Sequence, residues 1–304
     1  MKLLLLVNSS ASSVTARTRV VIQKALAADH TVVVAETSRR GHATRLAQGA
    51  AAEGVDVVVV LGGDGTVNEA ANGLAGTHTA LAPLPGGSTN VFARTIGLPD
   101  DPVEATAALL DALARRSIER VGLGSVDGRY FLFNVGLGFD AAVVARVEQR
   151  SSLKRYASHA WFAWCAVDTW FRHYDRSRPR FAVHHADGSI IDDAVFAICL
   201  NTNPYTFVGR RPFTVAPEAT LERGLALATF RSLSVGTILS AAVSALNRGE
   251  HLRHQRRIDV RTDLRAITVT GYGPFPYQVD GEYLGETTDL VLRHEPDVLD
   301  LVRP

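Results

Sequence analysis

Cysteine is scarce in this sequence, and long apolar runs are lacking. The 304 residues include two cysteines, Cys165 and Cys199, which lie in apolar stretches without the spacing of a metal site. Such residues indicate buried thiols in a reducing compartment and exclude a disulfide framework. No stretch approaches the roughly 18 apolar residues of a membrane span. The opening run 3–7 is shorter than the roughly 7–15 residues of a signal-peptide core and predicts a first strand. These absences favour a cytoplasmic protein.

A strong charge of one sign is also lacking. The formal net charge is +1, so the whole surface does not attract nucleic acid, and we expect no nucleic-acid partner. With 46% hydrophobic and 21% charged residues, the composition is that of a folded globular protein of one large or two ordinary domains. The sequence has no G-x-x-x-x-G-K-[ST] loop, no H-R-D and D-F-G pair and no H-E-x-x-H motif. These enzyme classes are therefore excluded.

Strand and helix signals alternate through the first third of the chain. This alternation predicts an α/β fold with a parallel sheet and helices on both of its faces. The predicted strands are 3–7, 30–36 and 55–61, and the predicted helices are 16–27, 43–52 and 66–74. After about residue 120 strand signals follow one another with turns between them, which predicts a mostly antiparallel second domain. Its predicted strands are 130–135, 181–185, 194–200, 226–230, 257–261 and 266–270.

A glycine-rich turn follows the most apolar of these strands. The run Val57–Leu61 leads into Gly62-Gly63-Asp64-Gly65-Thr66 and then into a predicted helix. Glycine lets the backbone turn sharply and lets an anion approach the main-chain N–H groups. The junction of a strand end with a helix N-terminus is where open α/β sheets bind phosphates. An aspartate beside a phosphate makes sense if a metal ion bridges them, and a tight turn with a capping aspartate is the alternative.

A second loop of the same kind lies further along the chain. The stretch Pro83–Arg94 follows the apolar run 80–82 and places glycines and hydroxyls at another junction of strand and helix. Two such loops on neighbouring strands could hold one nucleotide between them.

Together these motifs resemble the diacylglycerol kinase catalytic family, which includes the sphingosine kinases and lies in the NAD kinase superfamily. The stretches 62–69 and 83–94 match its GGDGT-x-NE and P-x-G-T/S-x-N-x-F-A-R patterns, 133–141 its Asn-x-x-Gly-x-Gly-Phe-Asp-Ala segment, and 278–282 its Asp-Gly-Glu signature. The resemblance spans nearly the whole chain. It implies a Rossmann-like nucleotide-binding domain over 1–125, a mostly antiparallel β-sandwich for the lipid over 126–290, and a segment 291–304 that returns to the first domain. It also implies that the site lies in the cleft.

The activity that the resemblance implies is that of an ATP- and Mg²⁺-dependent lipid kinase. Such an enzyme transfers the γ-phosphate to a lipid hydroxyl, and diacylglycerol is the acceptor we expect. An NAD kinase and a sphingosine-type kinase are alternatives within the superfamily. A catalytically silent regulator that binds nucleotide or lipid is the alternative from another class. Intact Asp64 and Glu282 argue against it. It stays open because Val91 replaces the aspartate that commonly follows Asn90 in the family, and because Arg223 replaces another family aspartate.

The resemblance also assigns site residues. Glu282 is the expected general base, with Asp280 beside it, and a solvent-exposed hairpin turn at Asp280 is the alternative. Asp64 is the expected metal residue and completes the catalytic set, because hard cations prefer carboxylate oxygens. The expected nucleotide-binding residues are Asn8, Ser9, Ser12, Thr37, Gly62, Gly63, Gly65, Thr66, Asn68, Glu69, Gly87, Ser88 and Asn90.

Two further positions affect the expected site. Arg223 stands where some family members carry an aspartate associated with a structural Mg²⁺. An arginine cannot bind a cation, so we expect no second metal site. The stretch 136–141 also fits a loose G-x-G-x-x-A dinucleotide pattern, but no acidic residue ends a second strand about 20 residues later. We interpret it as a structural turn, with Asp140 as a candidate site residue.

All three tryptophans lie in the segment 156–171, which has helical spacing. A core helix is one interpretation, and a lipid-side wall or membrane-contact helix is the other, because indoles favour interfaces. Two basic clusters could face anionic headgroups, and they consist of Arg172, Arg176, Arg178, Arg180, Arg253, Arg256 and Arg257. We therefore predict transient contact with the inner membrane surface. Formation of a homodimer stays an open alternative.

Overall fold

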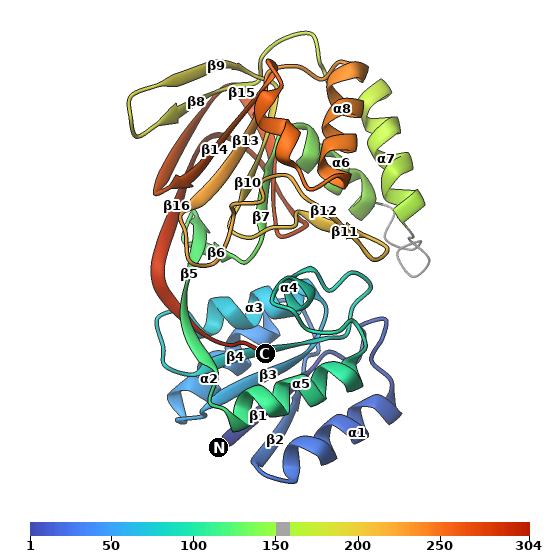
Figure 1. Cartoon of the computed structure of the whole chain (residues 1–304), viewed down its shortest axis with the longest axis vertical. Coiled ribbons are helices and arrows are strands. Elements are labelled where there is room, and N and C mark those ends of the chain that lie inside the picture. Colours follow the sequence, from blue (N-terminus) through green and yellow to red (C-terminus); the bar gives the residue numbers. More distant parts are fainter. Residues whose placement is uncertain (150–158) are drawn as a thin grey trace. The chain divides into compact units, whose positions relative to one another are not determined.

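The computed structural model describes residues 1–149 and 159–304, which form two compact units. Unit 1 consists of Met1–Leu123 and Pro296–Pro304, and unit 2 consists of Gly124–Glu295. Each unit has its own set of strands and helices (Figure 1), and strand pairing is continuous through β16 (Glu282–Val302). The strands β5 and β16 run through the points where the chain passes from one unit to the other.

Unit 1 is a parallel sheet flanked by helices. Its strands lie in the order β4-β3-β1-β2, and Leu301 at the end of β16 pairs in parallel with Leu81 of β4. The strands are β1 (Lys2–Val7), β2 (Thr31–Glu36), β3 (Val57–Gly62) and β4 (Ala80–Pro85), with the end of β16 (Glu282–Val302). The helices are α1 (Ala16–Ala27), α2 (His42–Ala52), α3 (Asp64–Leu74), α4 (Val91–Thr95) and α5 (Pro102–Ala114). Helix α2 packs on α3, and α1 packs on α5.

Local chemistry explains these elements. Every residue of β3 and of β4 is buried, as expected for central strands covered on both faces. Helix α1 begins after Thr15, whose hydroxyl accepts the N–H of Thr18, and α5 begins after Asp101, which caps it with Pro102 in its first turn. The six elements predicted in the first third of the chain are all present, with ends that differ by at most two residues.

Unit 2 is a mostly antiparallel sheet with the order β14-β13-β10-β7-β15-β16, and β8 pairs with β15 and β9. The strands are β5 (Ile118–Val126), β6 (Arg129–Phe131), β7 (Asn134–Leu137), β8 (Phe181–His185), β9 (Ile190–Ala194), β10 (Phe196–Leu200), β13 (Leu225–Phe230), β14 (Ile258–Leu264) and β15 (Ala266–Val279), with a small separate pair of β11 (Thr206–Val208) and β12 (Arg211–Phe213). The helices are α6 (Phe139–Gln149), α7 (His159–Arg172), α8 (Val235–Leu246) and the 3₁₀ helix η2 (Glu250–His254). The mixed fold with a parallel and an antiparallel part is confirmed.

Both faces of the unit 2 sheet are buried. Ala197 and Cys199 of β10 point into one apolar cluster, whereas Ile198 and Leu200 point into the other. The alternation follows from the two-residue period of a strand. The second cluster includes Ala241 of α8, so helices cover that face of the sheet.

Two expectations for this unit need correction or limitation. The predicted strand 130–135 is wrong as a single element, because β6 ends at Phe131 and β7 begins at Asn134. The predicted helix 156–171 corresponds to α7 from His159 onward, and residues 156–158 lie outside the described part of the chain. Among the described helices, none has both the length and the apolar composition needed to cross a bilayer.

Candidate functional site

The two glycine loops of unit 1 lie directly against each other. Gly62 pairs with Pro85 in neighbouring strands, and the N–H of Gly86 donates to the carbonyl of Gly62 at 2.9 Å. A Cβ on Gly87 would lie 2.8 Å from the Cα of Gly63, and one on Gly86 would lie 2.8 Å from the nitrogen of Gly62. Only glycine fits such spacing, so the loops need glycine at these positions in order to meet.

Asp64 joins the starts of two helices. It is the first residue of α3, its Oδ2 accepts the N–H of Val91 at 2.9 Å, and its Oδ1 accepts the N–H of Phe92 at 3.0 Å. Burial raises the pKa of Asp64, and the two N–H donors offset part of that rise. The capping interpretation of this aspartate is therefore correct, although the helix start that its carboxylate caps is that of α4.

Asn90 shapes the second loop. Its Oδ1 accepts the N–H of Gly87 at 2.7 Å and that of Gly86 at 3.2 Å, and its Nδ2 donates to Asp100 at 2.9 Å. The residue is buried and has φ of 50°, a left-handed conformation that asparagine tolerates better than most residues. Asn90 therefore positions the loop. Its side chain occupies the N–H groups of Gly86 and Gly87, which are then not available to a ligand.

The remaining loop residues lie at the same edge of the sheet. The carboxyl ends of parallel strands meet at one edge, so Asn8 after β1 and Thr37 after β2 join the glycine loops there. Asn8 donates to the buried Thr66 hydroxyl at 2.9 Å, and Ser9 donates to Glu36 at 2.6 Å. Four of the expected nucleotide residues are exposed at this edge, namely Ser9, Ser12, Gly65 and Ser88.

Two expected nucleotide residues have a structural use instead. Glu69 accepts the N–H groups of Gly41 at 2.8 Å and of Ala43 at 3.1 Å, which caps the start of α2. Asn68 is 1% exposed, and its backbone carbonyl accepts the amide of Asn72. Because Glu69 caps α2 and Asn68 is buried, we leave both out of the proposed nucleotide site.

The Asp-Gly signature of unit 2 is a buried hairpin turn. Asp280 and Gly281 connect β15 to β16 with φ of 47° and 78°, as in a type I′ turn. The Asp280 carboxylate accepts the N–H groups of Leu132 at 2.7 Å, Phe133 at 3.0 Å and Asn134 at 3.0 Å. The alternative of an exposed hairpin turn is right about the turn and about Gly281, which is exposed, whereas Asp280 is buried.

Glu282 follows this turn and forms an ion pair with Arg129. The Arg129 guanidinium donates to its Oε2 at 2.6 Å, and both side chains remain partly exposed. Arg129 was missed by sequence reasoning. A signal was present, since Arg129 follows a second Asp-Gly turn at Asp127 and Gly128, with φ of 48° and 76°. Two hairpins of the same form thus present a glutamate and an arginine to each other.

A buried network of polar side chains supports the Asp280 turn. Asp140 accepts the hydroxyl of Tyr205 at 2.6 Å and the amide of Gln278 at 2.9 Å. Gln278 also donates to Asn134 at 2.7 Å and accepts the N–H of Gly281 at 2.7 Å. Burial raises the pKa of Asp140, and burial beside that carboxylate raises the pKa of Tyr205 well above its usual range. Asp140 therefore holds the turn in place through Gln278.

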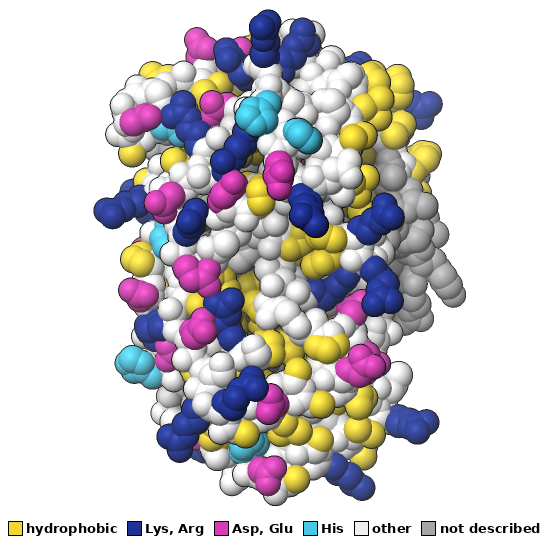
Figure 2. Space-filling model, in the orientation of Figure 1, with side chains coloured by type: hydrophobic (Ala, Val, Ile, Leu, Met, Phe, Trp, Pro, Cys, Tyr) yellow, Lys and Arg dark blue, Asp and Glu magenta, His cyan; other side chains and the backbone are white. Residues whose placement is uncertain are grey.

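Helix α7 has both a core face and an exposed apolar face. Cys165 and Thr169 are buried, whereas Trp164 is 44% and Phe171 is 68% exposed. The Trp170 indole donates to the carbonyl of Leu233 at 2.9 Å, at the start of α8. Figure 2 shows hydrophobic side chains gathered where Figure 1 draws α7 and α8. The core and surface interpretations of the tryptophan helix therefore each describe one of its faces.

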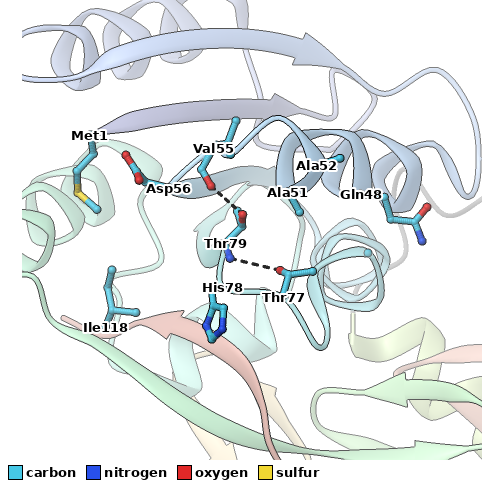
Figure 3. A pocket seen from close by; sticks show the side chains of 12 residues that line it. Met1, Gln48, Ala51, Ala52, Val55, Asp56, Thr77, His78, Thr79 and Ile118 are labelled. Atoms are coloured by element: carbon cyan, nitrogen blue, oxygen red, sulfur yellow. Dashed lines mark hydrogen bonds between the residues drawn. The ribbon is translucent and has the colours of Figure 1, made fainter.

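A pocket of unit 1 lies away from the loops. It has a volume of about 760 Å³ and is lined by residues that precede strands, including Met1, Asp56 and Thr79 (Figure 3). Thr79 donates to the carbonyl of Val55 at 2.7 Å across this end of the sheet. Open α/β sheets bind ligands at the carboxyl ends of strands, so we do not assign the nucleotide to this pocket.

The residues present fit Mg²⁺ only as an ion that a nucleotide brings. Among the described residues, no three Asp, Glu, His or Cys side chains gather as a metal cage. Each Asp64 oxygen accepts one N–H, which leaves a lone pair on each. Mg²⁺ commonly takes one or two carboxylates and completes its shell with phosphates and water. Asp64 fits that arrangement.

Comparison with known proteins agrees with this geometry. The sequence model of the diacylglycerol kinase catalytic domain matches residues 2–126. The diacylglycerol kinase of Bacillus subtilis (strain 168) is 28% identical over 271 residues, which cover 87% of this chain and 84% of that protein. That of Staphylococcus aureus (strain NCTC 8325 / PS 47) is 28% identical over 256 residues, which cover 82% of this chain and 75% of that protein.

Solved structures show the same fold. A crystal structure from Bacillus anthracis str. Sterne has a TM-score of 0.77 at 23% identity and covers 100% of this chain and 97% of its own. The crystal structure of a diacylglycerol kinase from the same organism has a TM-score of 0.71 at 20% identity with the same coverage.

Proposed function

We propose that this chain, whose residues 2–126 match the diacylglycerol kinase catalytic domain, is a kinase that transfers the γ-phosphate of ATP to the hydroxyl of diacylglycerol. The observation that carries this proposal is the pair of glycine loops in unit 1. Gly63 and Gly87 are held within contact distance, and the start of α3 opens beside them. Phosphates bind readily at such a helix start because its first N–H groups have no partner within the helix.

The open residues of this edge suit a polyphosphate. Gly65 lies in the first turn of α3, and a Cβ there would meet no protein atom within 4 Å. The exposed hydroxyls of Ser12 and Ser88 come from the loops after β1 and β4. We assign the phosphates of ATP to Gly63, Gly65 and these two hydroxyls. Asp64 would hold the Mg²⁺ that accompanies the nucleotide, and the bound ion would neutralise phosphate charge.

Glu282 is the proposed general base. Its partly exposed carboxylate can accept the proton of the lipid hydroxyl while that oxygen bonds to the γ-phosphorus and the bond to ADP breaks. Arg129 fixes the orientation of the carboxylate through its hydrogen bond to Oε2. Asp280 acts as a positioning residue, because its carboxylate holds the turn that carries Glu282.

Val91 argues for activity and against a silent regulator. Val91 replaces a family aspartate, so any contact made by that carboxylate is missing here. The side chain of Val91 is 4% exposed and packs inward. Its backbone N–H donates to Asp64 whatever the side chain is. The clamp between α3 and α4 is therefore intact in this chain.

A transfer assay tests the proposal. Purified protein with labelled ATP and Mg²⁺ is offered diacylglycerol, sphingosine and monoacylglycerol in mixed micelles, and NAD in a parallel sample. We expect label in the diacylglycerol product, with none when Mg²⁺ is chelated. Strong labelling of NAD with none of the lipids would contradict a lipid kinase, and labelling of sphingosine alone would change the acceptor.

A further inference from the structure

Helix α8 of unit 2 turns an apolar stripe toward solvent. Val235, Leu239, Val243 and Leu246 are 54%, 61%, 59% and 43% exposed, and their spacing places them on one face of the helix. The opposite face, which includes Ala241 and Ala245, is buried. All twelve residues of α8 are uncharged. A surface helix of a globular protein ordinarily shows charged or polar residues outward, so this stripe calls for a partner.

A basic segment runs back along one side of this stripe. Residues 248–257 contain four arginines and one glutamate. The segment includes η2, which packs on α8, and Ser240 in the middle of the helix donates to Gln255 at 2.8 Å. Arg257 donates to Ser232 at 3.3 Å, just before the helix starts. The arginines therefore accompany α8 from its C-terminal end to its N-terminal end.

A further arginine lies near the start of α8. The Trp170 indole donates to the carbonyl of Leu233, and the Arg176 guanidinium lies 3.6 Å from the centre of that indole ring. In Figure 2, histidine and Lys or Arg side chains lie beside the hydrophobic side chains of this region. The surface thus combines an exposed apolar stripe with positive charge along its edge.

We infer that this α8 surface, formed by Val235, Leu239, Val243 and Leu246 with Arg248, Arg256 and Arg257 along its edge, docks on an anionic lipid bilayer. Interfacial helices place an apolar face at the boundary of headgroups and acyl chains and a basic flank among the lipid phosphates. The inference rests on the proposed function, since diacylglycerol resides in a membrane. It specifies the surface through which unit 2 meets that membrane.

The charge and the size of the surface favour a bilayer over a second copy of the chain. Two copies meeting through α8 would bring two sets of arginines together, which opposes association. A twelve-residue helix is about 18 Å long and about 10 Å wide, so one face of it covers about 180 Å². That area is far smaller than the ~800 Å² that each partner buries in a stable protein interface. A bilayer offers negative charge and an apolar layer at once.

Vesicle binding tests the apolar stripe. The full chain is sedimented with vesicles of phosphatidylcholine, with and without phosphatidylglycerol. We expect binding to the anionic vesicles, and we expect the double change Leu239→Glu and Val243→Glu to weaken it about tenfold or more. The matched control is Ile190→Glu, which alters a 58% exposed apolar side chain on β9 of the same unit and should leave binding unchanged.

The arginines are tested separately. Replacing Arg248 and Arg256 with glutamine should weaken binding to anionic vesicles by about fivefold per arginine, and binding to pure phosphatidylcholine should stay the same. Hydrogen exchange on the unaltered protein gives a readout that needs no variant. Vesicles should protect the amides of α8 and leave those of β9 unprotected.

Turnover separates this inference from the proposed function. The α8 variants should keep normal turnover on a short-chain, water-soluble diacylglycerol and lose it on long-chain diacylglycerol in vesicles. Absence of vesicle binding by the unaltered protein, or equal binding by the α8 variants, would overturn the docking surface. So would light scattering that shows a dimer which the α8 change splits. Vesicle binding through α8 without any lipid phosphorylation would instead contradict the proposed function alone.

Discussion

Asp64 in unit 1 and Asp280 in unit 2 sit in separate motifs, yet their carboxylates do the same work. Each follows a strand, and each accepts backbone N–H groups from another segment, Val91 and Phe92 in one case and residues 132–134 in the other. Each aspartate therefore fixes a turn by joining it to a distant part of the chain. A motif aspartate in this fold is first a clamp on the backbone.

The two clamps differ in what they leave open beside them. Next to Asp64 the free groups are a helix start and the bare backbone of Gly65, which suit an anion. Next to Asp280 lies the Glu282 carboxylate, which is ion-paired with Arg129 and partly exposed. Under the proposed function, the same clamp would support phosphate binding in one unit and acid-base chemistry in the other.

Apart from replacement of the proposed base Glu282, the substitution Asp64→Asn is expected to cause the largest loss of turnover. The asparagine amide would face one of the two N–H donors, and the charge that would hold Mg²⁺ would be lost. We expect turnover to fall about 10²-fold or more, since electrostatic groups of this kind commonly contribute that much. Circular dichroism and steady-state rates check it. Near-normal rates in Mg²⁺ from a folded variant would contradict the metal role.

Asp280→Asn should act through stability. Three N–H groups would lose a charged acceptor, so we expect the free energy of unfolding to fall by about 1–3 kcal/mol, with a loss of turnover that follows the disturbed turn. Denaturant unfolding measures the first and the rate assay the second. Unchanged stability would show that the turn does not need this clamp.

Gly65→Ala separates the ligand from the fold. Gly65 and Gly49 are both helical glycines, and a Cβ on either would meet no protein atom within 4 Å. Alanine should stabilise each helix by up to about 1 kcal/mol. We expect only Gly65→Ala to weaken ATP binding, by about tenfold, because its methyl group would meet the phosphates. Equal ATP affinity for the two variants would remove Gly65 from the site.

The smallest effect concerns pH. Burial raises the folded-state pKa of Asp140 above its unfolded value of about 3.9, so the folded protein favours the protonated acid. The stability that this gives is present below about pH 4 and is lost as pH rises through the raised pKa. The free energy of unfolding of the unaltered protein should therefore exceed that of the Asp140→Asn variant by less and less as pH rises.

Asp187→Asn provides a control of opposite sign for that pH series. Hydrogen bonds from Ser189 lower the pKa of Asp187 in the folded protein. Its contribution is present above the unfolded pKa and is lost as pH falls. The difference in free energy of unfolding between the unaltered protein and the Asp187→Asn variant should grow as pH rises. If this difference followed the same trend for both variants, the assigned burial of Asp140 would be contradicted.

The sequence predicted the parallel half well because its signals are local. The central strand Val57–Gly62 is uniformly apolar, and helices α1 and α5 have local caps at Thr15 and Asp101. It failed at residues 130–135, where the break between β6 and β7 coincides with the N–H groups taken by Asp280, about 150 positions later. Long-range bonds of this kind leave no periodic trace. For the same reason Glu69 was expected at the nucleotide, whereas it caps α2.

The most direct test of the two-unit division of labour is Glu282→Gln, which keeps the shape of the side chain and removes its basicity. Calorimetric titration with Mg²⁺-ATP and turnover on diacylglycerol are measured on the same preparation, with Glu286→Gln as the control on the same strand. We predict unchanged ATP affinity and a 10²–10⁴-fold loss of turnover, the usual contribution of a general base. Normal turnover, or loss of ATP binding, would contradict Glu282 as the base.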